Sequence, residues 1–281
     1  MYAYDKDVMN IDNRPIGVFD SGLGGLTAVR KLMDVLPCED IIYLGDTGRN
    51  PYGGRSRETL IKYTRQDMAF LLSHNIKAAV IACGTVSTNA LDIVAGDYDI
   101  PVIGVVRPAV DSAVQMTRNR RIGLIGTEAS IRSGTYTRLI HQRLPDAAVI
   151  SQACPLFVPL VENGRIQPGD IVIETVAREY LTPVREQGVD TLILGCTHYP
   201  LISSVIAGVM GSGVKLISPG AETALDAAST LRRLGLETDR KTPGRYSYYV
   251  TDRVDGFEKT ASLFLERSIA GSVTQVELDT L

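Results

Sequence analysis

Four cysteines and three histidines are few for a chain of 281 residues, and their spacing excludes the common cysteine frameworks. The cysteines at positions 38, 83, 154 and 196 form no C-x-x-C pair, and no histidine lies at zinc-finger spacing from them. We therefore expect neither a disulfide framework nor a metal site. For Cys38 and Cys154 the plainest interpretation is a small, buried apolar side chain.

An excess of charge of one sign is also missing. The 29 Lys and Arg residues against 32 Asp and Glu residues give a net charge of −3, without a basic stripe, so nothing suggests nucleic-acid binding. No apolar run has the length needed to cross a bilayer, and we expect no membrane partner. Residues 1–14 are polar and lack the regions of a secretory signal, which predicts a loose leader and a cytoplasmic protein.

Short apolar runs alternate with amphipathic stretches, which is typical of an α/β fold with mostly parallel sheets flanked by helices. Strands are predicted at 16–19, 40–44, 78–82, 102–105, 121–125, 147–151, 191–194, 214–217 and 246–250. Helices are predicted over 26–36, 56–74, 131–144 and 170–187. The two halves look alike, which predicts two similar domains, 1–107 with a returning segment 220–281, and 108–219. Chance alternation within one α/β chain is the alternative to a duplication.

Two glycine-rich segments follow predicted strands. Residues 20–25 read Asp-Ser-Gly-Leu-Gly-Gly, and the N–H groups at the following helix start favour an anionic group. The third glycine place of the dinucleotide fingerprint holds Thr27, so we expect no Rossmann cofactor. Asp20 is either functional or a turn and capping residue. The loop 50–54 is either a plain loop or a wall of the substrate pocket, with Gly53 offering exposed backbone.

Cys83 and Cys196 follow apolar runs at matching places in the two halves. We expect both thiols at the carboxyl ends of strands, where open α/β sheets bind ligands. A helix start after each cysteine would favour the thiolate, with a hydroxyl such as that of Thr85 or Thr197 as the cap. Two thiols in equivalent places suit a reaction that removes a proton from one face of a carbon and returns one to the other face.

Two further residues are candidate proton partners of a thiol. His198 follows Cys196 by two positions, and Glu162 ends the largely apolar segment 154–162. The plainer interpretations are a structural histidine and a solvent-facing carboxylate. Cys–His nucleophilic catalysis, as in acyl transfer, is an alternative, although it would leave Cys83 without a role.

These segments resemble the glutamate racemase family. The resemblance is carried by Asp-Ser-Gly-x-Gly-Gly at 20–25, Pro-Tyr-Gly at 51–53, Ala-Cys-x-Thr at 82–85, Pro-Leu-Phe-Val-Pro-Leu-Val-Glu at 155–162, and Gly-Cys-Thr-His-Tyr-Pro-Leu at 195–201. It implies two α/β domains with the active site in the cleft between them. The implied activity is cofactor-independent racemisation of L-glutamate to D-glutamate, which supplies D-glutamate for peptidoglycan synthesis.

The resemblance also implies residue roles. Cys83 and Cys196 would be the acid/base pair, Asp20 would assist Cys83, and Glu162 and His198 would assist Cys196. Asp20 would either accept the thiol proton or raise the pKa of Cys83, which opposes thiolate formation. The family further suggests a homodimer, and no cofactor is expected. The residues expected to hold the substrate glutamate are Asp20, Ser21, Tyr52, Gly53, Gly84, Thr85, Thr127, Thr197 and His198.

One position departs from the family pattern. The family commonly has Asn directly after the first catalytic cysteine, where this chain has Gly84, so only the backbone of residue 84 can contact substrate. Gly84 leaves open a homologue that binds ligand without turnover. An aspartate or related amino-acid racemase also stays open, because a substrate difference of one carbon is decided by pocket shape. Some family members also restrain a partner such as DNA gyrase, and no motif of this chain indicates that role.

Overall fold

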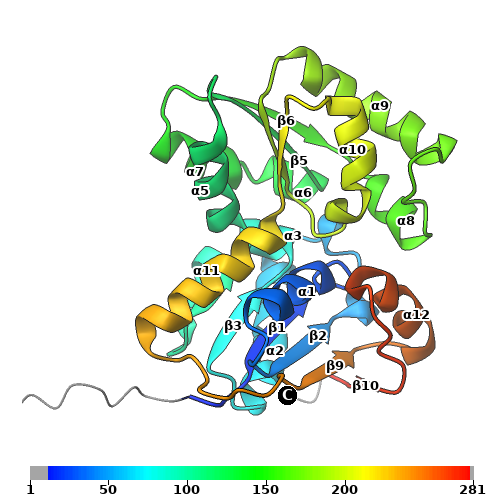
Figure 1. Cartoon of the computed structure of the whole chain (residues 1–281). Coiled ribbons are helices and arrows are strands. Elements are labelled where there is room, and N and C mark those ends of the chain that lie inside the picture. The colour runs from blue at the N-terminus through cyan, green and yellow to red at the C-terminus, as the bar shows by residue number, and fades with distance from the viewer. Residues whose placement is uncertain (1–11, 279–281) are drawn as a thin grey trace, which may run out of the picture.

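A computed structural model describes residues 12–278, and within them the strands form two sheets whose strand pairs are all parallel. The two sheets lie in separate lobes, one above the other in Figure 1. The larger sheet has the order β10-β9-β2-β1-β3-β4, and the smaller has the order β6-β5-β7-β8. The strands are β1 (Ile16–Asp20), β2 (Ile41–Gly45), β3 (Ala78–Ile81), β4 (Val102–Gly104), β5 (Arg121–Gly126), β6 (Ala148–Ala153), β7 (Thr191–Leu194), β8 (Lys215–Ile217), β9 (Tyr246–Val250) and β10 (Val273–Gln275).

Helices flank both sheets, so the predicted α/β fold with mostly parallel sheets is confirmed. The α-helices are α1 (Leu26–Val35), α2 (Arg57–Ser73), α3 (Gly84–Asn89), α4 (Leu91–Val94), α5 (Val106–Met116), α6 (Glu128–Arg132), α7 (Thr135–Arg143), α8 (Phe157–Glu162), α9 (Ile171–Glu186), α10 (Ser203–Met210), α11 (Pro219–Leu234) and α12 (Val254–Leu265). Short 3₁₀ turns are η1 (Thr47–Arg49), η2 (Tyr52–Gly54), η3 (Ala95–Asp97) and η4 (Tyr199–Ile202). Most of the predicted leader, residues 1–11, lies outside the described residues.

The central strands are apolar because both faces of the larger sheet are covered. All five residues of β1 are buried. Val18 packs in a cluster with side chains of α1 and α11, whereas Phe19 packs in another cluster with side chains of α2. Successive side chains of a strand point to opposite faces, so a strand buried on both sides reads as a continuous apolar run.

One predicted element was wrong, and one strand was missed. The helix predicted over 131–144 is two helices, α6 and α7, and the chain breaks between them at Gly134, whose φ is 65°. Helix α6 starts earlier than predicted because the Thr127 hydroxyl accepts a hydrogen bond of 3.3 Å from the Ser130 N–H and so caps it. The short strand β10 was not predicted, since its side chains are half-buried or exposed and form no apolar run.

The chain returns to the larger sheet after building the smaller one. Strand β9 pairs with β2, and β10 pairs with β9, so segment 246–275 joins the sheet formed by segment 16–104. Helices α5 and α11 contact each other at the junction of the lobes. The predicted boundaries at 107/108 and 219/220 fall in the first turns of these two helices, and the division into domains stays a prediction.

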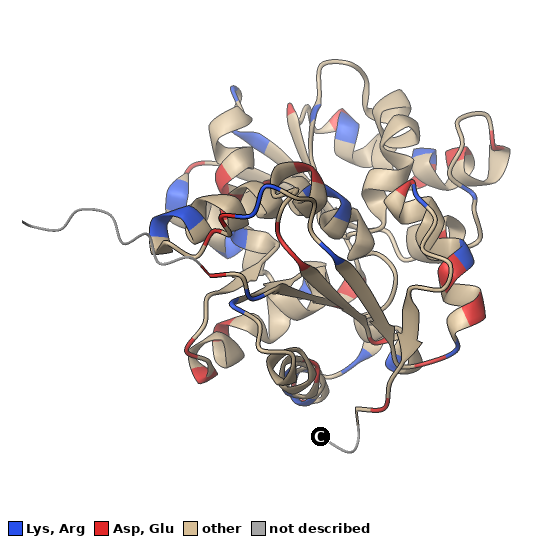
Figure 2. Cartoon of the chain, turned by 60° about the horizontal axis from the view of Figure 1, so that its bottom comes forward, with Lys and Arg blue, Asp and Glu red and all other residues tan. Residues whose placement is uncertain are grey.

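Charged side chains of both signs are interspersed along the helices and loops. Figure 2 shows Lys and Arg next to Asp and Glu over this face of the protein, whereas the strands carry little charge. Within residues 12–278, no helix combines the length and the apolar character needed to span a membrane.

Candidate active site

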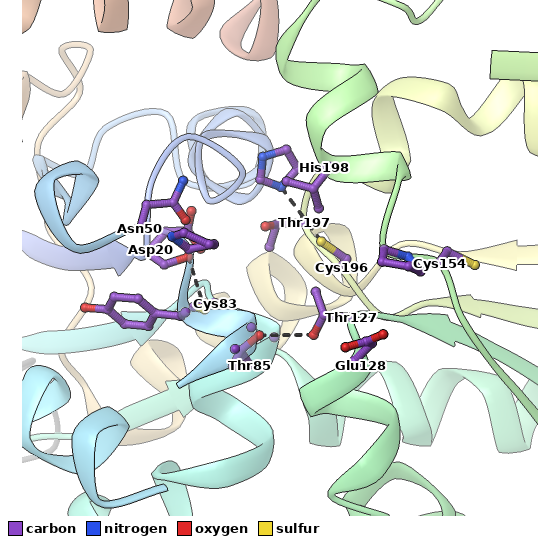
Figure 3. A pocket seen from close by; sticks show the side chains of 18 of the residues that line it. Asp20, Asn50, Cys83, Thr85, Thr127, Glu128, Cys154, Cys196, Thr197 and His198 are labelled. Carbon is purple, nitrogen blue, oxygen red and sulfur yellow. Dashed lines mark hydrogen bonds between the residues drawn. The ribbon is translucent and has the colours of Figure 1, made fainter. Parts of the chain in front are cut away.

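A cavity of about 420 Å³ is lined by residues of both lobes. All twelve residues singled out as acid/base or substrate-holding candidates line it. They are Asp20, Ser21, Tyr52, Gly53, Cys83, Gly84, Thr85, Thr127, Glu162, Cys196, Thr197 and His198. In Figure 3, Cys83 and Thr85 extend from one side of the cavity, and Cys196, Thr127 and Glu128 from the other.

Strand pairing explains why these residues meet. Asp20 pairs with Gly45 and Phe19 with Ile81, so the residues that follow β1, β2 and β3 share one sheet edge. In the smaller sheet Ile125 pairs with Leu194, which brings the ends of β5 and β7 together in the same way. The cavity thus lies between the carboxyl edges of two parallel sheets, where ligands bind in open α/β folds.

The Cys83 side combines a buried thiol with a buried carboxyl. The Cys83 thiol donates a weak hydrogen bond of 3.6 Å to the Ser21 hydroxyl, and Asp20 accepts one of 3.1 Å from the Gly22 N–H. Burial raises the pKa of Asp20, and the positive charge of His198 counteracts part of that rise. Burial and the Asp20 charge raise the pKa of Cys83 to about 12, so this thiol holds its proton at neutral pH.

The Cys196 side combines a thiol with an imidazole and a carboxylate. The Sγ of Cys196 lies 3.8 Å from Nδ1 of His198, and Nε2 of the same ring lies 3.0 Å from Oε1 of Glu162. The edge-to-face packing of His198 against Phe264 of α12 holds the ring from a third direction. Burial lowers the pKa of His198, but the hydrogen bonds and negative charges of Cys196 and Glu162 outweigh it and raise the pKa to about 10. His198 is therefore an imidazolium at neutral pH.

The cavity has no lysine or arginine among its lining residues in the described part of the chain. Its polar groups are hydroxyls, backbone N–H groups, carboxylates and the His198 ring. The hydroxyls of Thr85 and Thr127 lie 3.2 Å apart and connect the two lobes. The Thr27 hydroxyl donates a bond of 3.0 Å to the Thr197 carbonyl and so connects the glycine-rich segment to the Cys196 loop. An anionic ligand would be bound here by oriented dipoles and the His198 imidazolium, and not by a lysine or arginine side chain.

The elements that follow the two cysteines in the chain differ from the predicted capped helices. Cys83 occupies the N-cap position of α3, but no side chain caps this six-residue helix. After Cys196 the chain forms the 3₁₀ turn η4, and His198, not Thr197, occupies its N-cap position, without a capping bond. Pro200 lies at an early position of that turn. Burial and Asp20 outweigh any thiolate-favouring effect of the short α3 on Cys83.

Glycines allow close approaches between the thiol-bearing loops. A β-carbon on Gly24 would lie 2.5 Å from Nδ1 of His198, so the glycine-rich segment passes directly against that ring. A β-carbon on Gly84 would lie 2.7 Å from the carbonyl oxygen of Gly195, which precedes Cys196. The effect of Gly84 is therefore not only the absence of the Asn side chain common in the family. Its backbone also forms the close contact between the two cysteine loops.

Other lining residues were not named individually as site residues, although the loop 50–54 was one candidate for a wall of the pocket and all of it lines the cavity. They are Asn50, Pro51, Gly54, Glu128, Cys154, Pro155, Val158, Pro159 and Gly195. Cys154 is fully buried as expected, and it also lines the cavity. The position of Glu128 directly after Thr127, at the carboxyl end of β5, is the signal that could have identified it.

A sequence profile of the Asp/Glu/hydantoin racemase family matches residues 51–227. The chain belongs to this family. Its curated relatives include glutamate racemases of Geobacter metallireducens, 44% identical over 95% of this chain and 97% of the relative, and of Lactococcus lactis, 45% identical over 91% and 93%. The predicted resemblance is thereby confirmed.

Solved structures agree with this assignment. Glutamate racemase of Francisella tularensis, crystallised in complex with D-glutamate, matches with a TM-score of 0.89 and 41% identity over 96% of this chain and all of that one. The Thermus thermophilus enzyme matches with a TM-score of 0.86 and 40% identity over 96% and 100%. Aspartate racemase of Picrophilus torridus has a TM-score of 0.52 at 17% identity over 79% and 94%, a likeness of fold alone.

Proposed function

We propose that this chain interconverts L- and D-glutamate without a cofactor, by proton transfer between two thiols, and supplies D-glutamate for peptidoglycan synthesis. The observation that carries the proposal is that Cys83 and Cys196 line one cavity from different lobes. A substrate α-carbon between them would be reached on both faces. Glutamate racemases that are 44–45% identical to this chain support glutamate as the substrate.

The proposed reaction starts from one arrangement of protons, with the proton on Cys83. In that arrangement the His198 imidazolium would stand next to the sulfur that removes the substrate proton, and Glu162 holds the ring in place. The Cys196 thiolate would remove the proton from the substrate α-carbon while the Cys83 thiol delivers its proton to the opposite face. After that step Cys196 carries the proton and Cys83 is the thiolate, which is the arrangement needed for the reverse direction.

Asp20 has two roles in this scheme. Its negative charge helps to keep the proton on Cys83. A bound amino acid brings an ammonium group, and that group would neutralise Asp20 and so ease formation of a thiolate at Cys83. The enzyme would therefore activate Cys83 only when substrate is present.

The substrate carboxylates require donors, because removing the α-proton adds negative charge next to one of them. Backbone N–H groups and hydroxyls oriented before the reaction stabilise such charge at little reorganisation cost. We assign this role to Ser21, Tyr52, Gly53, Gly84, Thr85, Thr127 and Thr197, with His198 close by.

Three further proposals concern the setting of this activity. We propose that residues 1–107 with 220–281 and residues 108–219 form the two domains, that the protein acts as a homodimer, and that it works in the cytoplasm. The two separate sheets support the division, and the family resemblance supports the assembly and the location. Light scattering of the purified protein tests the dimer, because a monomer at all concentrations contradicts it.

Incubation of the purified protein with L-glutamate in D₂O tests the function directly. We expect the optical rotation to decay to zero and every product molecule to carry deuterium at the α-carbon. Cys83→Ala and Cys196→Ala should each abolish the decay in both directions while retaining the wild-type circular dichroism. Faster turnover of L-aspartate would favour the related racemase instead, and glutamate-induced stabilisation without any loss of rotation would favour a binding homologue.

A further inference from the structure

A buried polar cluster lies behind the loop 50–54 that lines the cavity. Its members are Asp46, Arg49, Tyr52 and Asp67, and we name it the loop anchor. The carboxylates of Asp46 and Asp67 are fully buried, and Tyr52 is 1% exposed. Of the four, only Tyr52 lines the cavity, so the other three can reach the site only through the loop.

The guanidinium of Arg49 is the centre of the loop anchor. Its Nε donates to Asp46 Oδ2 at 2.6 Å, Nη2 to Asp67 Oδ1 at 2.9 Å, and Nη1 to Gln66 Oε1 at 2.5 Å. Its carbon Cζ also lies 4.2 Å from the ring centre of Tyr63. Every nitrogen of the fork therefore has a partner, and the geometry of arginine suits this arrangement better than that of lysine.

The contacts of the Tyr52 hydroxyl indicate which of the two carboxyl groups, Asp46 or Asp67, carries a proton. It contacts Asp46 Oδ2 closely and also lies 3.1 Å from Asp67 Oδ2. A phenol has one hydrogen, so it can donate to only one of these carboxyl groups. Asp46 is the closer acceptor and already accepts hydrogen bonds from Arg49 and from the Thr251 hydroxyl at 2.8 Å. The second contact is then satisfied only if Asp67 carries a proton and donates it to the phenol oxygen.

The charge count leads to the same arrangement. One guanidinium and two ionised carboxylates would leave a net negative charge buried next to Asp20, which is costly. With a proton on Asp67 the cluster is neutral. Burial and the nearby negative charge of Asp46 raise the pKa of Asp67 well above its usual range, in spite of Arg49.

The loop anchor connects the loop to both sides of the site. The Asp46 N–H donates a bond of 3.0 Å to the carbonyl of Asp20, which assists Cys83 in the proposed mechanism. Next to Tyr52, a β-carbon on Gly53 would lie 3.7 Å from the Thr127 side chain of the other lobe. A shift of the Tyr52 hydroxyl would therefore displace groups that we assign to substrate binding.

We propose that Asp46, Arg49 and Asp67 are positioning residues that hold the substrate-binding loop 50–54 through the Tyr52 hydroxyl, with one proton resting on Asp67. The inference rests on the proposed function for its kinetic readout and is independent of it for the structural readout. It assigns different roles to two buried aspartates, and that difference can be tested by isosteric substitution.

Asp67→Asn and Asp46→Asn form the decisive pair. An asparagine at 67 accepts from Arg49 through its oxygen and donates to Tyr52 through its nitrogen, as a protonated Asp67 would, so we expect a wild-type KM for glutamate. An asparagine at 46 would place an amide nitrogen opposite a hydrogen-bond donor that Asp46 now accepts from. It would also remove the negative charge that balances the Arg49 guanidinium. For Asp46→Asn we expect KM to rise by about tenfold or more, with a smaller change in kcat.

Tyr52→Phe keeps the test decisive if Asp46→Asn does not fold. It removes only the hydroxyl, so we expect KM to rise by about tenfold, the size expected for loss of a hydrogen bond to a charged group. Hydrogen–deuterium exchange of the glutamate-free protein gives the independent readout. The amides of 50–54 should exchange faster in Tyr52→Phe and at the wild-type rate in Asp67→Asn.

Asp97→Asn is the matched control. It removes an exposed partner of Arg65, which lies on the same helix as Asp67. We expect neither KM nor loop exchange to change. An equal rise in KM in Asp67→Asn and Asp46→Asn would overturn the assignment of the proton to Asp67. A wild-type exchange rate of the 50–54 amides in Tyr52→Phe would overturn the proposal that the Tyr52 hydroxyl holds the loop. A wild-type protein without racemase activity would overturn the proposed function and leave the exchange result valid.

Discussion

Glu162 and His198 are joined by a hydrogen bond of 3.0 Å between Oε1 and Nε2, and this bond turns Nδ1 of the ring toward the sulfur of Cys196. The carboxylate comes from the last residue of α8, and the ring from the loop after β7. Glu162 therefore both orients the ring and stabilises its positive charge. No equivalent imidazole accompanies Cys83 among the residues that line the cavity, so the two thiols are activated by different means.

Glu162→Gln tests the charge of this carboxylate while keeping its shape. The amide oxygen still accepts from Nε2, but the bond is no longer assisted by charge, so the imidazolium is less stable. We expect kcat/KM to fall by about 10- to 100-fold, which corresponds to the loss of about 1.5–3 kcal/mol. Initial rates of racemisation followed by circular dichroism measure the effect, and Glu179→Gln, an exposed carboxylate on α9, is the control.

The same variant has a second consequence that thermodynamics requires. Enantiomers have equal free energies, so kcat/KM must stay equal for L- and D-glutamate whatever the substitution does to one thiol. The effect of Glu162→Gln on bond breaking should instead show in one direction, as a larger isotope effect with substrate deuterated at the α-carbon. Equal isotope effects in both directions would argue against Cys196 acting as the base for one enantiomer.

The pH dependence of stability tests the protonation of His198. Its pKa is about 10 in the folded protein against an ordinary value of 6.5. The folded state binds this proton more tightly than the unfolded chain, so the contribution to stability is fully present below pH 6.5 and is lost as pH rises through about 10. We expect the difference in free energy of unfolding between wild type and His198→Asn to shrink steadily across that interval. Urea unfolding of both proteins at several pH values measures it, and a difference that grows with pH contradicts the assignment.

The positions of the two thiols could be predicted from the sequence because they depend on short-range rules. An apolar run marks a strand buried on both faces, and its last residue marks the sheet edge where ligands bind. Cys83 and Cys196 satisfy both rules. The type of helix that follows each cysteine, and the residue that caps it, depend on backbone geometry that neighbouring hydroxyls do not determine. The expected cap at Thr197 was therefore wrong.

Features that depend on contacts between distant segments could not be predicted. Asp67 lies within an amphipathic helix, where it reads as an ordinary polar residue, and only the fold places Arg49 and Tyr52 against it. The direction in which Asp20 acts on Cys83 was also open, because burial, charge and N–H groups act in opposite directions. The structure resolves this balance, since burial and the Asp20 charge together raise the pKa of that thiol.

Asp20→Asn separates the two effects of this carboxyl group. Removing its charge should lower the pKa of Cys83, because that charge raises it. We therefore expect Cys83 in the ligand-free variant to react with iodoacetamide at lower pH than in wild type, as followed by peptide mass spectrometry. Racemisation should nevertheless fall, because the amide no longer pairs with the substrate ammonium. Parallel loss of both thiol reactivity and turnover would contradict this account.

Gly84→Ala tests whether the contact between the two cysteine loops determines their separation. The added methyl group would lie 2.7 Å from the Gly195 carbonyl oxygen, which is backbone and cannot rotate away, so the two lobes must separate by a fraction of an ångström. A displacement of this kind acts on both thiols at once, and misplacement of reacting groups by 1 Å costs about a hundredfold in rate. We expect kcat to fall by about tenfold with little change in the unfolding midpoint. Gly208→Ala is the matched control, because a β-carbon there meets no atom within 4 Å. If Gly84→Ala retained the wild-type kcat, the cysteines would be positioned by the sheets alone, and the glycine contact would have no part in the reaction.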